Sequence, residues 1–322
     1  MKKKSVALVG IGSVVSIAAL GAVGNYFYNL ALNPKASKEK IFGNTDKTTD
    51  KLTIKDTSGR VTEEEMTWFK EKSNHKSVYV NSYDNLKLHG YLVKKEESNK
   101  WAIVVHGYMG NAANLVNAIK KFNELGYNVI APDLRGHGRS EGTYIGMGWH
   151  DRLDIINWIN YITEINENAN IVLYGISMGA GTVMMAAGEE LKENVKAVIE
   201  DCGYTSAWNQ FSYQLKSMYK KVPEFPVMHS ASVVSKLKAG YSIREASAIK
   251  QLSKAKVPML FIHGDKDEFV PYSMLQEVYD SAINCEKEKL IIEGAGHAKS
   301  FLVNPELYWE TVKNFLNKYI KE

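Results

Sequence analysis

Three residues that could together activate a nucleophile occur along the chain in the order Ser177, Asp267 and His297. A serine hydroxyl attacks a carbonyl carbon efficiently when a histidine removes its proton, and a carboxylate holds that histidine in the right tautomer. Each of the three residues follows a short apolar run of strand length. If those strands are parallel neighbours, their carboxyl ends meet at one edge of a sheet, where the three side chains can converge.

The serine lies at the apex of a predicted tight turn. The strand-like run Ile171–Tyr174 ends in Gly175-Ile176-Ser177-Met178-Gly179, and small, apolar residues of helical character follow. This order indicates a strand, a sharp turn and a helix. A turn this tight strains the serine backbone and leaves no room for side chains two positions before and after it, which explains Gly175 and Gly179.

Donors for a developing oxyanion are expected from two places. One is the N-terminus of the helix after the serine, where the N–H of Met178 is not used by the helix. The other is the sequence His106-Gly107-Tyr108-Met109-Gly110-Asn111, which follows the apolar run Trp101–Val105. The N–H of Tyr108 is the expected second donor, and His106 is expected to pack rather than to react.

Three aspartates compete for the role of the acid. Asp201 follows the apolar run Val195–Ile199, while Asp265 and Asp267 both follow the run Pro258–Ile262. Asp265 comes directly after a glycine and suits a turn-capping side chain, so we choose Asp267 and keep Asp201 as the alternative. The base is His297, in the glycine-rich stretch Glu293-Gly294-Ala295-Gly296-His297.

A second glycine-rich loop, Asp133 to Ser140, is predicted to be structural. Its glycines indicate a tight loop, and Asp133 and Arg135 are expected to hold it by hydrogen bonds. His137 precedes the serine in the chain and lies between two glycines.

The stretch Tyr204–Gln251 interrupts an otherwise regular alternation of strands and helices. It is rich in large apolar residues and has Pro223 and Pro226 in its middle. An insertion of this composition is predicted to form a cap over the serine. The residues expected to line the substrate site are Trp208, Phe211, Met218, Phe225 and Met228.

The remaining apolar runs predict the architecture. Runs near residues 77–80 and 86–93 alternate apolar and polar residues around Asp84-Asn85, as a hairpin at a sheet edge does. From Trp101 onward, continuous apolar strands alternate with helical segments. This pattern predicts the α/β class: a mostly parallel central sheet, helices on both faces, and the cap between the sixth and seventh strands.

Composition excludes some classes of protein. The chain has 322 residues, a net charge of +4 and scattered lysines, so we expect no nucleic-acid partner. Two cysteines, Cys202 and Cys285, lie far apart without metal-ligand spacing. We expect them to be buried small residues, although a disulfide stays open.

The N-terminus predicts a membrane segment. Lysines at positions 2–4 precede an uncharged run from Ser5 to Phe27. We expect residues 1–32 to be an uncleaved anchor or a signal peptide, residues 33–60 a polar linker, and residues 61–322 the folded domain with its cap at about 204–251. The domain would then lie outside the cytoplasm, attached to the membrane or, alternatively, secreted.

Five motifs now support a resemblance: HGYMGN, DLRGHGRSEG, GISMGAG, HGDKDEFVP and GAGH. Over about residues 79–319 the chain resembles bacterial serine hydrolases of the α/β-hydrolase superfamily, in particular the monoglyceride-lipase-like and serine-aminopeptidase-like branch. The resemblance implies an α/β-hydrolase fold, Ser177 as nucleophile, Asp267 as acid, His297 as base, and the Tyr108 and Met178 amides as the oxyanion hole.

We therefore expect an enzyme that hydrolyses carboxylic esters of short to medium acyl chain through an acyl-enzyme, on a small-molecule or lipid-like substrate. No metal or organic cofactor is expected. Three alternatives stay open: a peptidase or aminopeptidase on the same triad, a thioesterase or lysophospholipase, and a non-catalytic surface-binding protein.

Overall fold

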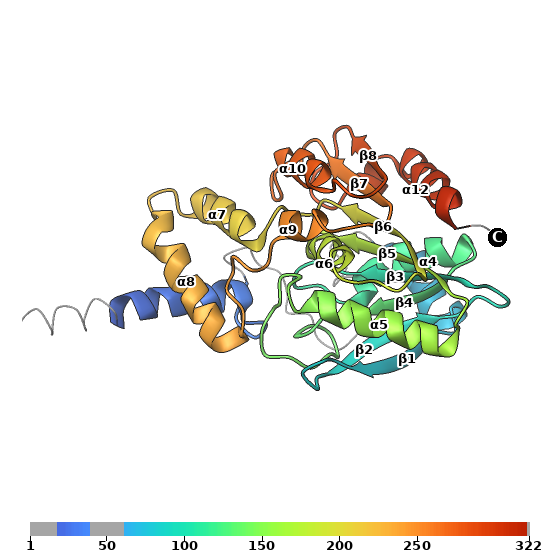
Figure 1. Cartoon of the computed structure of the whole chain (residues 1–322), viewed down its shortest axis with the longest axis horizontal. Helices are drawn as coiled ribbons and strands as arrows, with labels where there is room; N and C mark the ends of the chain where they lie inside the picture. The colour runs from blue at the N-terminus through green and yellow to red at the C-terminus, as the bar shows by residue number, and fades with distance from the viewer. Residues whose placement is uncertain (1–17, 39–60, 321–322) are drawn as a thin grey trace, which may run out of the picture.

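The computed structural model describes residues 18–38 and 61–320, and its centre is a sheet of eight strands (Figure 1). The strand order is β1-β2-β4-β3-β5-β6-β7-β8. Strands β1, β2 and β4 pair antiparallel, and every other pair is parallel. The strands are β1 (Lys76–Asn81), β2 (Lys87–Val93), β3 (Lys100–Val105), β4 (Asn128–Pro132), β5 (Asn170–Ile176), β6 (Val195–Asp201), β7 (Met259–Gly264) and β8 (Lys287–Ile292).

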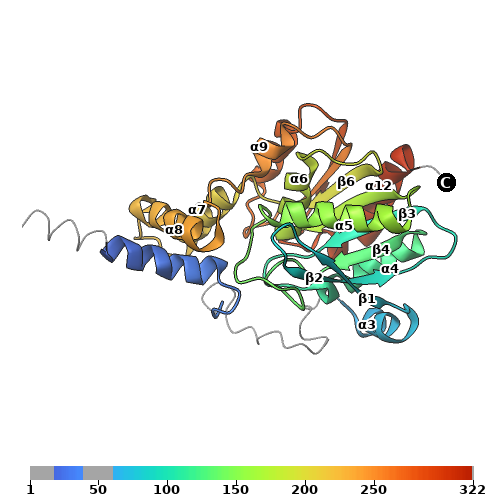
Figure 2. The same cartoon turned by 60° about the horizontal axis from the view of Figure 1, so that its bottom comes forward.

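Helices connect the strands and cover both faces of the sheet (Figures 1 and 2). Thr62 begins α3 with a capping box, in which its side chain accepts from the Glu65 N–H. A further helix spans residues 18–32. The others are α3 (Glu63–Thr67), η2 (Trp68–Lys72), η3 (Ala112–Leu115), α4 (Val116–Glu124), α5 (Asp151–Ile165), α6 (Met178–Ala187), α7 (Ala207–Met218), α8 (Glu224–Ala239), α9 (Ala248–Leu252), α10 (Ser273–Ser281), α11 (Ser300–Val303) and α12 (Pro305–Tyr319).

Two apolar cores lie on the two faces, because successive strand residues point to opposite sides. In β5, Ile171 and Leu173 join the core under α5, α6 and α9, whereas Val172 and Tyr174 join the core under α4 and α12. Strands buried on both faces must be apolar at every position, which explains the continuous runs in the sequence. The predicted fold class, the edge hairpin β1–β2 and the cap between β6 and β7 are confirmed.

The helix of residues 18–32 lies beside α8 at one end of the molecule (Figures 1 and 2). The two helices approach so closely that a Cβ on Gly24 would lie 2.5 Å from the Ser230 carbonyl oxygen. Lys238 Nζ donates to Asn25 Oδ1 over 2.6 Å. At the C-terminal end of the helix, Lys38 Nζ donates to three carbonyls, and burial lowers its pKa to about 8.

The predicted membrane segment falls partly outside the described residues, since residues 1–17 are not among them. Within the described ranges, no helix combines the length and apolar character needed to cross a bilayer. The described part of the segment, residues 18–32, is a helix that contacts α8 of the cap.

The loop after β4 is held by buried polar side chains, as predicted. Asp133 accepts hydrogen bonds from His89 Nδ1 and from the N–H groups of Ala112 and Arg139. These bonds outweigh the opposing effect of burial, so the pKa of Asp133 lies below its usual range.

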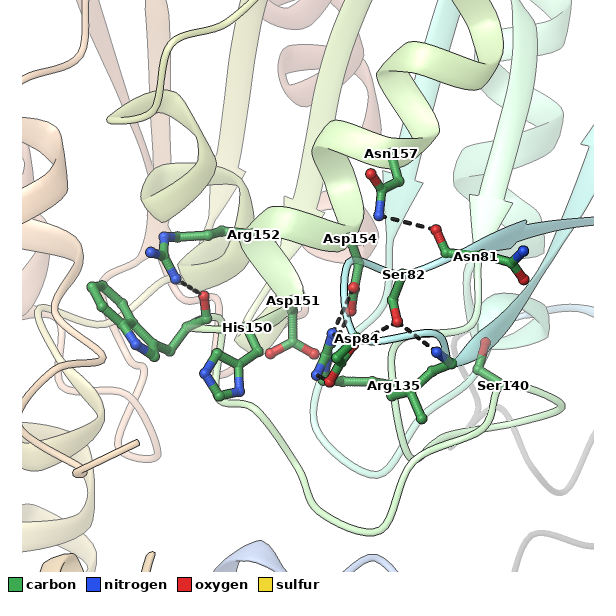
Figure 3. A network of polar contacts seen from close by, with 12 residues as sticks. Asn81, Ser82, Asp84, Arg135, Ser140, His150, Asp151, Arg152, Asp154 and Asn157 are labelled. Carbon is green, nitrogen blue, oxygen red and sulfur yellow. Dashed lines mark hydrogen bonds and ion pairs between the residues drawn. The ribbon is translucent and has the colours of Figure 1, made fainter. Parts of the chain in front are cut away.

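Arg135 is fully buried and links three parts of the chain (Figure 3). Its guanidinium makes two bonds of 2.7 Å to Asp154 on α5, and bonds of 3.0 and 3.1 Å to Asp84 in the β1–β2 turn. Paired bonds of this kind fix both distance and orientation. Arg135 therefore ties the hairpin and α5 to the loop after β4.

Replacing this guanidinium by an apolar side chain should destabilise the fold strongly. Arg135→Met leaves the Asp154 and Asp84 carboxylates without their partner, and we expect the free energy of unfolding to fall by about 3–5 kcal/mol. Chemical denaturation measures the change. Arg139→Met, at an exposed position of the same loop, is the control and should cost less than about 1 kcal/mol. Equal effects of the two substitutions would contradict the role of Arg135.

Glu200, at the end of β6, is another buried ionisable residue, and it lacks such a partner. It has no exposed surface; Oε2 accepts from the Gly203 N–H over 2.9 Å, while Oε1 has no hydrogen-bond partner among the described residues. Burial raises the pKa of Glu200 to about 8, even though nearby His263 favours the charged form. The carboxyl group is therefore protonated at neutral pH.

This pKa predicts a pH-dependent gain in stability for Glu200→Gln. Between about pH 4.3 and about pH 8, the carboxyl group of Glu200 is protonated in the folded protein and ionised in the unfolded chain. The wild type therefore loses stability as the pH rises through this range. The amide oxygen of glutamine can still accept a hydrogen bond from the Gly203 N–H, and the side chain has no ionisable group whose charged form burial would disfavour. The difference in unfolding free energy, variant minus wild type, should grow by roughly 2–4 kcal/mol between pH 5 and pH 8. A difference independent of pH would contradict this. Glu193→Gln, on the surface, is the control.

Candidate active site

Ser177 occupies the tight turn between β5 and α6 in a strained backbone conformation. Its φ is 57° and its ψ is −114°, outside the regions that a residue with a side chain prefers. A Cβ on Gly175 would lie 2.2 Å from the Gly179 carbonyl oxygen, and a Cβ on Gly179 would lie 2.1 Å from that of Val105. Only glycine fits at these two positions, which is the constraint expected from the sequence.

His297 bridges the serine and the chosen aspartate. Its Nε2 lies 2.9 Å from Ser177 Oγ, and its Nδ1 lies 2.7 Å from Asp267 Oδ2. An ionised carboxylate can only accept, so Nδ1 carries the proton and Nε2 is left to accept from the serine hydroxyl. The structure thus brings together three side chains that are separated by 120 positions in the sequence.

The other two candidate acids lie elsewhere. The Asp201 carboxylate accepts from the hydroxyls of Ser300 and Tyr308. Asp265 accepts from the Gly294 N–H over 2.6 Å, so it binds the loop after β8 and does not cap its own turn. Within the part of the chain that the structure describes, neither aspartate forms a hydrogen bond with His297.

Asp267 is kept ionised by an unusual number of donors. Besides the bond from His297, Asp267 accepts hydrogen bonds from the backbone N–H groups of Phe269 and Val270, each 2.9 Å long. His263 Nε2 lies 3.3 Å from its Oδ2. Burial of Asp267 opposes ionisation, but the bonds from His263 and His297 prevail and hold its pKa well below the usual range.

The expected oxyanion donors lie on either side of the serine. Met178 is the first residue of α6, so its N–H has no partner within the helix. Tyr108 follows Gly107, where an added Cβ would lie 3.4 Å from Ser177 Cβ. Both Tyr108 and Met178 line the same cavity as Ser177.

Two histidines hold the loop that carries Tyr108. His106 donates from Nδ1 to the Gly107 carbonyl and accepts the Leu134 N–H at Nε2. His137 accepts the Met109 N–H at Nε2 over 3.3 Å. Burial lowers the pKa of both, that of His137 to about 3, so both are neutral and can accept. Both act as packing residues.

An apolar cavity beneath the cap leads to Ser177. Three of the five predicted lining residues, Phe211, Met218 and Met228, line it. The other two do not. Trp208 is buried inside the cap, where its Nε1 donates to Glu224 and the Arg244 guanidinium stacks on its ring. Phe225 points outward and is 71% exposed.

Sequence reasoning did not find the wall contributed by residues 18–32. Phe27, Leu30 and Ala31 line the cavity, and the Tyr108 hydroxyl donates to the Ala31 carbonyl over 2.6 Å. A signal was present in the sequence, because asparagines at 25, 29 and 33 form a stripe at helical spacing. A polar stripe of this kind indicates packing against protein.

Among the described residues, one group has the ligand types that a metal needs. Potential ligand atoms of Cys202, Asp267 and His297 lie within 4.8 Å of one another. The side chains fit a metal poorly, because the Asp267–His297 pair is already hydrogen-bonded and burial raises the pKa of the Cys202 thiol well above its usual value. A protonated thiol is a weak ligand. Cys202 and Cys285 are both free thiols.

Comparison with known proteins agrees with this geometry. A family model described as alpha/beta hydrolase fold matches residues 101–226. The uncharacterized protein YqkD of Bacillus subtilis is 31% identical over 229 residues, which cover 71% of this chain and 74% of that protein.

Solved structures with the same fold include enzymes. The esterase Pf2001 of Pyrococcus furiosus is 25% identical, with a TM-score of 0.64 over 81% of this chain and 96% of that chain. The acylaminoacyl peptidase of Pyrococcus horikoshii shares the fold at 20% identity, with a TM-score of 0.59 over 81% of this chain and 44% of that chain. The chain belongs to the alpha/beta hydrolase fold family, and its esterase neighbour supports a hydrolase.

Proposed function

We propose that the protein is a serine hydrolase that cleaves carboxylic esters of short to medium acyl chain. The observation that carries the proposal is the continuous hydrogen-bonded series from Ser177 Oγ through His297 to Asp267, at the end of an apolar cavity. The esterase Pf2001 supports the choice of reaction. In this proposal Ser177 is the nucleophile, His297 the general base and Asp267 the acid.

The reaction has two steps. His297 Nε2 takes the proton of Ser177 as Oγ attacks the ester carbonyl, and the N–H groups of Tyr108 and Met178 bind the oxyanion. The imidazolium then gives that proton to the departing alcohol, which leaves an acyl-serine. Water attacks the acyl-serine with His297 as base, and the carboxylic acid and the free serine are released. Asp267 stabilises the imidazolium in both steps.

The cavity favours an ester over a peptide with a free amino terminus. None of its lining residues is charged, and most are apolar or aromatic. An ammonium group buried there would have no carboxylate to pair with, which is costly. A peptidase would need such a partner. The apolar wall instead suits an acyl chain.

We also propose the location expected from the sequence, with the chain attached to a membrane by its N-terminal segment and the hydrolase domain outside the cytoplasm. Lysines at positions 2–4 and the uncharged run from Ser5 to Phe27 support this. Secretion after cleavage is the alternative. Protease accessibility of the domain in intact cells distinguishes an external from an internal location.

Ser177→Ala tests the nucleophile. Hydrolysis of p-nitrophenyl butyrate should fall by about 10⁴-fold or more, because no hydroxyl remains to form the acyl-enzyme. A fluorophosphonate probe should label the wild type at Ser177 and leave the variant unlabelled. Thermal unfolding should stay close to wild type. Retained turnover in the variant would exclude this mechanism, and absence of labelling in the wild type would favour a non-catalytic protein.

Leu30→Ala tests whether the cavity receives the acyl chain. Removal of part of the wall should lower kcat/KM for an octanoyl ester by about fivefold to tenfold more than for an acetyl ester. Leu20→Ala, at an exposed position of the same helix, is the matched control and should change neither value. An equal loss for both esters would place the acyl chain elsewhere.

A further inference from the structure

Large apolar side chains are exposed together at the cap end of the molecule. Leu20, Val23 and Tyr26 are 37–42% exposed on the helix of residues 18–32. On α8, Val233 is 60% and Leu237 80% exposed. The two helices lie side by side, joined at Gly24 and Ser230. We call these five residues, with Phe225 at the start of α8, the cap patch. Apolar residues gathered in this way on one end indicate a binding surface.

Positive charge is concentrated in the same two segments. In the described part of the N-terminal segment, residues 18–38 contain two lysines and no acidic residue, and residues 204–251 contain seven lysines or arginines and two glutamates. The two segments therefore carry +2 and +5. Because the whole chain carries +4, and residues 1–17 carry +3 of it, the rest of the protein carries −6. Lys236 and Lys238 directly flank Leu237, so charge and apolar surface occur together.

We propose that the cap patch docks on the surface of an anionic lipid bilayer. Apolar side chains of an amphipathic surface enter the interface, while flanking lysines stay at the level of the headgroups and bind their negative charge. The acidic remainder of the protein would be repelled by the same surface, which orients the molecule with its cap toward the lipid.

A second copy of the chain fits this surface less well. Two cap patches placed face to face would bring two strongly positive segments together, and like charges repel. A bilayer supplies the opposite charge. The chain also leads directly into lipid-compatible sequence, because residues 5–17 contain no charged residue and continue N-terminally from the patch. This docking is additional to the proposed anchor, since it uses α8 of the cap.

Docking of the cap patch on a bilayer would affect how a substrate reaches the cavity. The same helix that exposes Leu20 and Val23 on one side contributes Phe27, Leu30 and Ala31 to the cavity wall. An ester dissolved in the bilayer would therefore meet the cavity from the side of the cap patch. This consequence rests on the proposed esterase function; the docking itself does not.

The test uses the full chain carrying an environment-sensitive fluorophore. Leu237→Cys is labelled in a Cys285→Ser background, with Cys202 buried, and mixed with phosphatidylcholine vesicles with and without phosphatidylglycerol. We expect a blue shift and quenching by lipid-borne quenchers with the anionic vesicles, weakened by salt. The matched control is Ile283→Cys, which is 69% exposed and lies outside the cap, and its label should not respond.

A second pair of variants measures the contribution of the patch. Val233→Glu with Leu237→Glu should weaken the response of a label at position 225 to anionic vesicles by about tenfold or more, whereas Ile283→Glu should not. Hydrolysis of a soluble ester should be unchanged in both, which shows that they are folded. If the protein co-floats with vesicles while the fluorophore at position 237 still reports an aqueous environment, only the N-terminal anchor binds the bilayer. That result would overturn the proposal. A blue shift without vesicles that rises with protein concentration would also overturn it, in favour of a second copy.

Discussion

The turn between β5 and α6 is the constraint on which the rest of the site depends. The chain must pass from a buried strand into a buried helix within a few residues, and the backbone is so crowded that Gly175 and Gly179 leave no room for a methyl group. Ser177 is forced to a positive φ. This strain is stabilised by the packing of β5 and α6 on both sides, and it points the hydroxyl out beyond the sheet edge.

His297, with Asp267 behind it, reaches that hydroxyl because parallel strands place their carboxyl ends at one edge. Asp267 follows β7 and His297 follows β8, and these two strands are neighbours. Loops alone would not hold the pair with the accuracy that proton transfer needs. Backbone amides at Phe269 and Val270 fix Asp267, and His263 approaches it from within the sheet. Buried neutral histidines fix the loop carrying Tyr108 in a comparable way.

The substrate side of the site is assembled from distant parts of the chain. Helices α7 and α8 form one wall of the cavity, and residues 27–31 form another. The hydrogen bond from the Tyr108 hydroxyl to Ala31 joins this wall to the loop that carries a proposed oxyanion donor. The cavity wall and this loop are thus held together by a direct hydrogen bond. The helix of residues 18–32 is therefore part of the cavity wall.

Local sequence determined the strands, the turn at Ser177 and the structural loop at Asp133, because these features arise from short-range rules of periodicity and steric crowding. The choice of Asp267 over Asp265 rested on a local rule, that an aspartate directly after a glycine caps its own turn. The rule excluded the right residue, although Asp265 in fact binds the Gly294 N–H in the loop after β8. The tertiary structure decided what depends on the direction of a side chain relative to distant elements. Trp208 and Phe225 are as apolar as Met228, yet one packs within the cap and the other faces solvent. Phe27 lies 150 positions and Leu30 147 positions before the serine, and only the crossing of their helix over α8 brings them to the cavity. Burial of one particular face of a helix is a property of the assembled protein, because the sequence shows which side chains are apolar but not which surface each will meet.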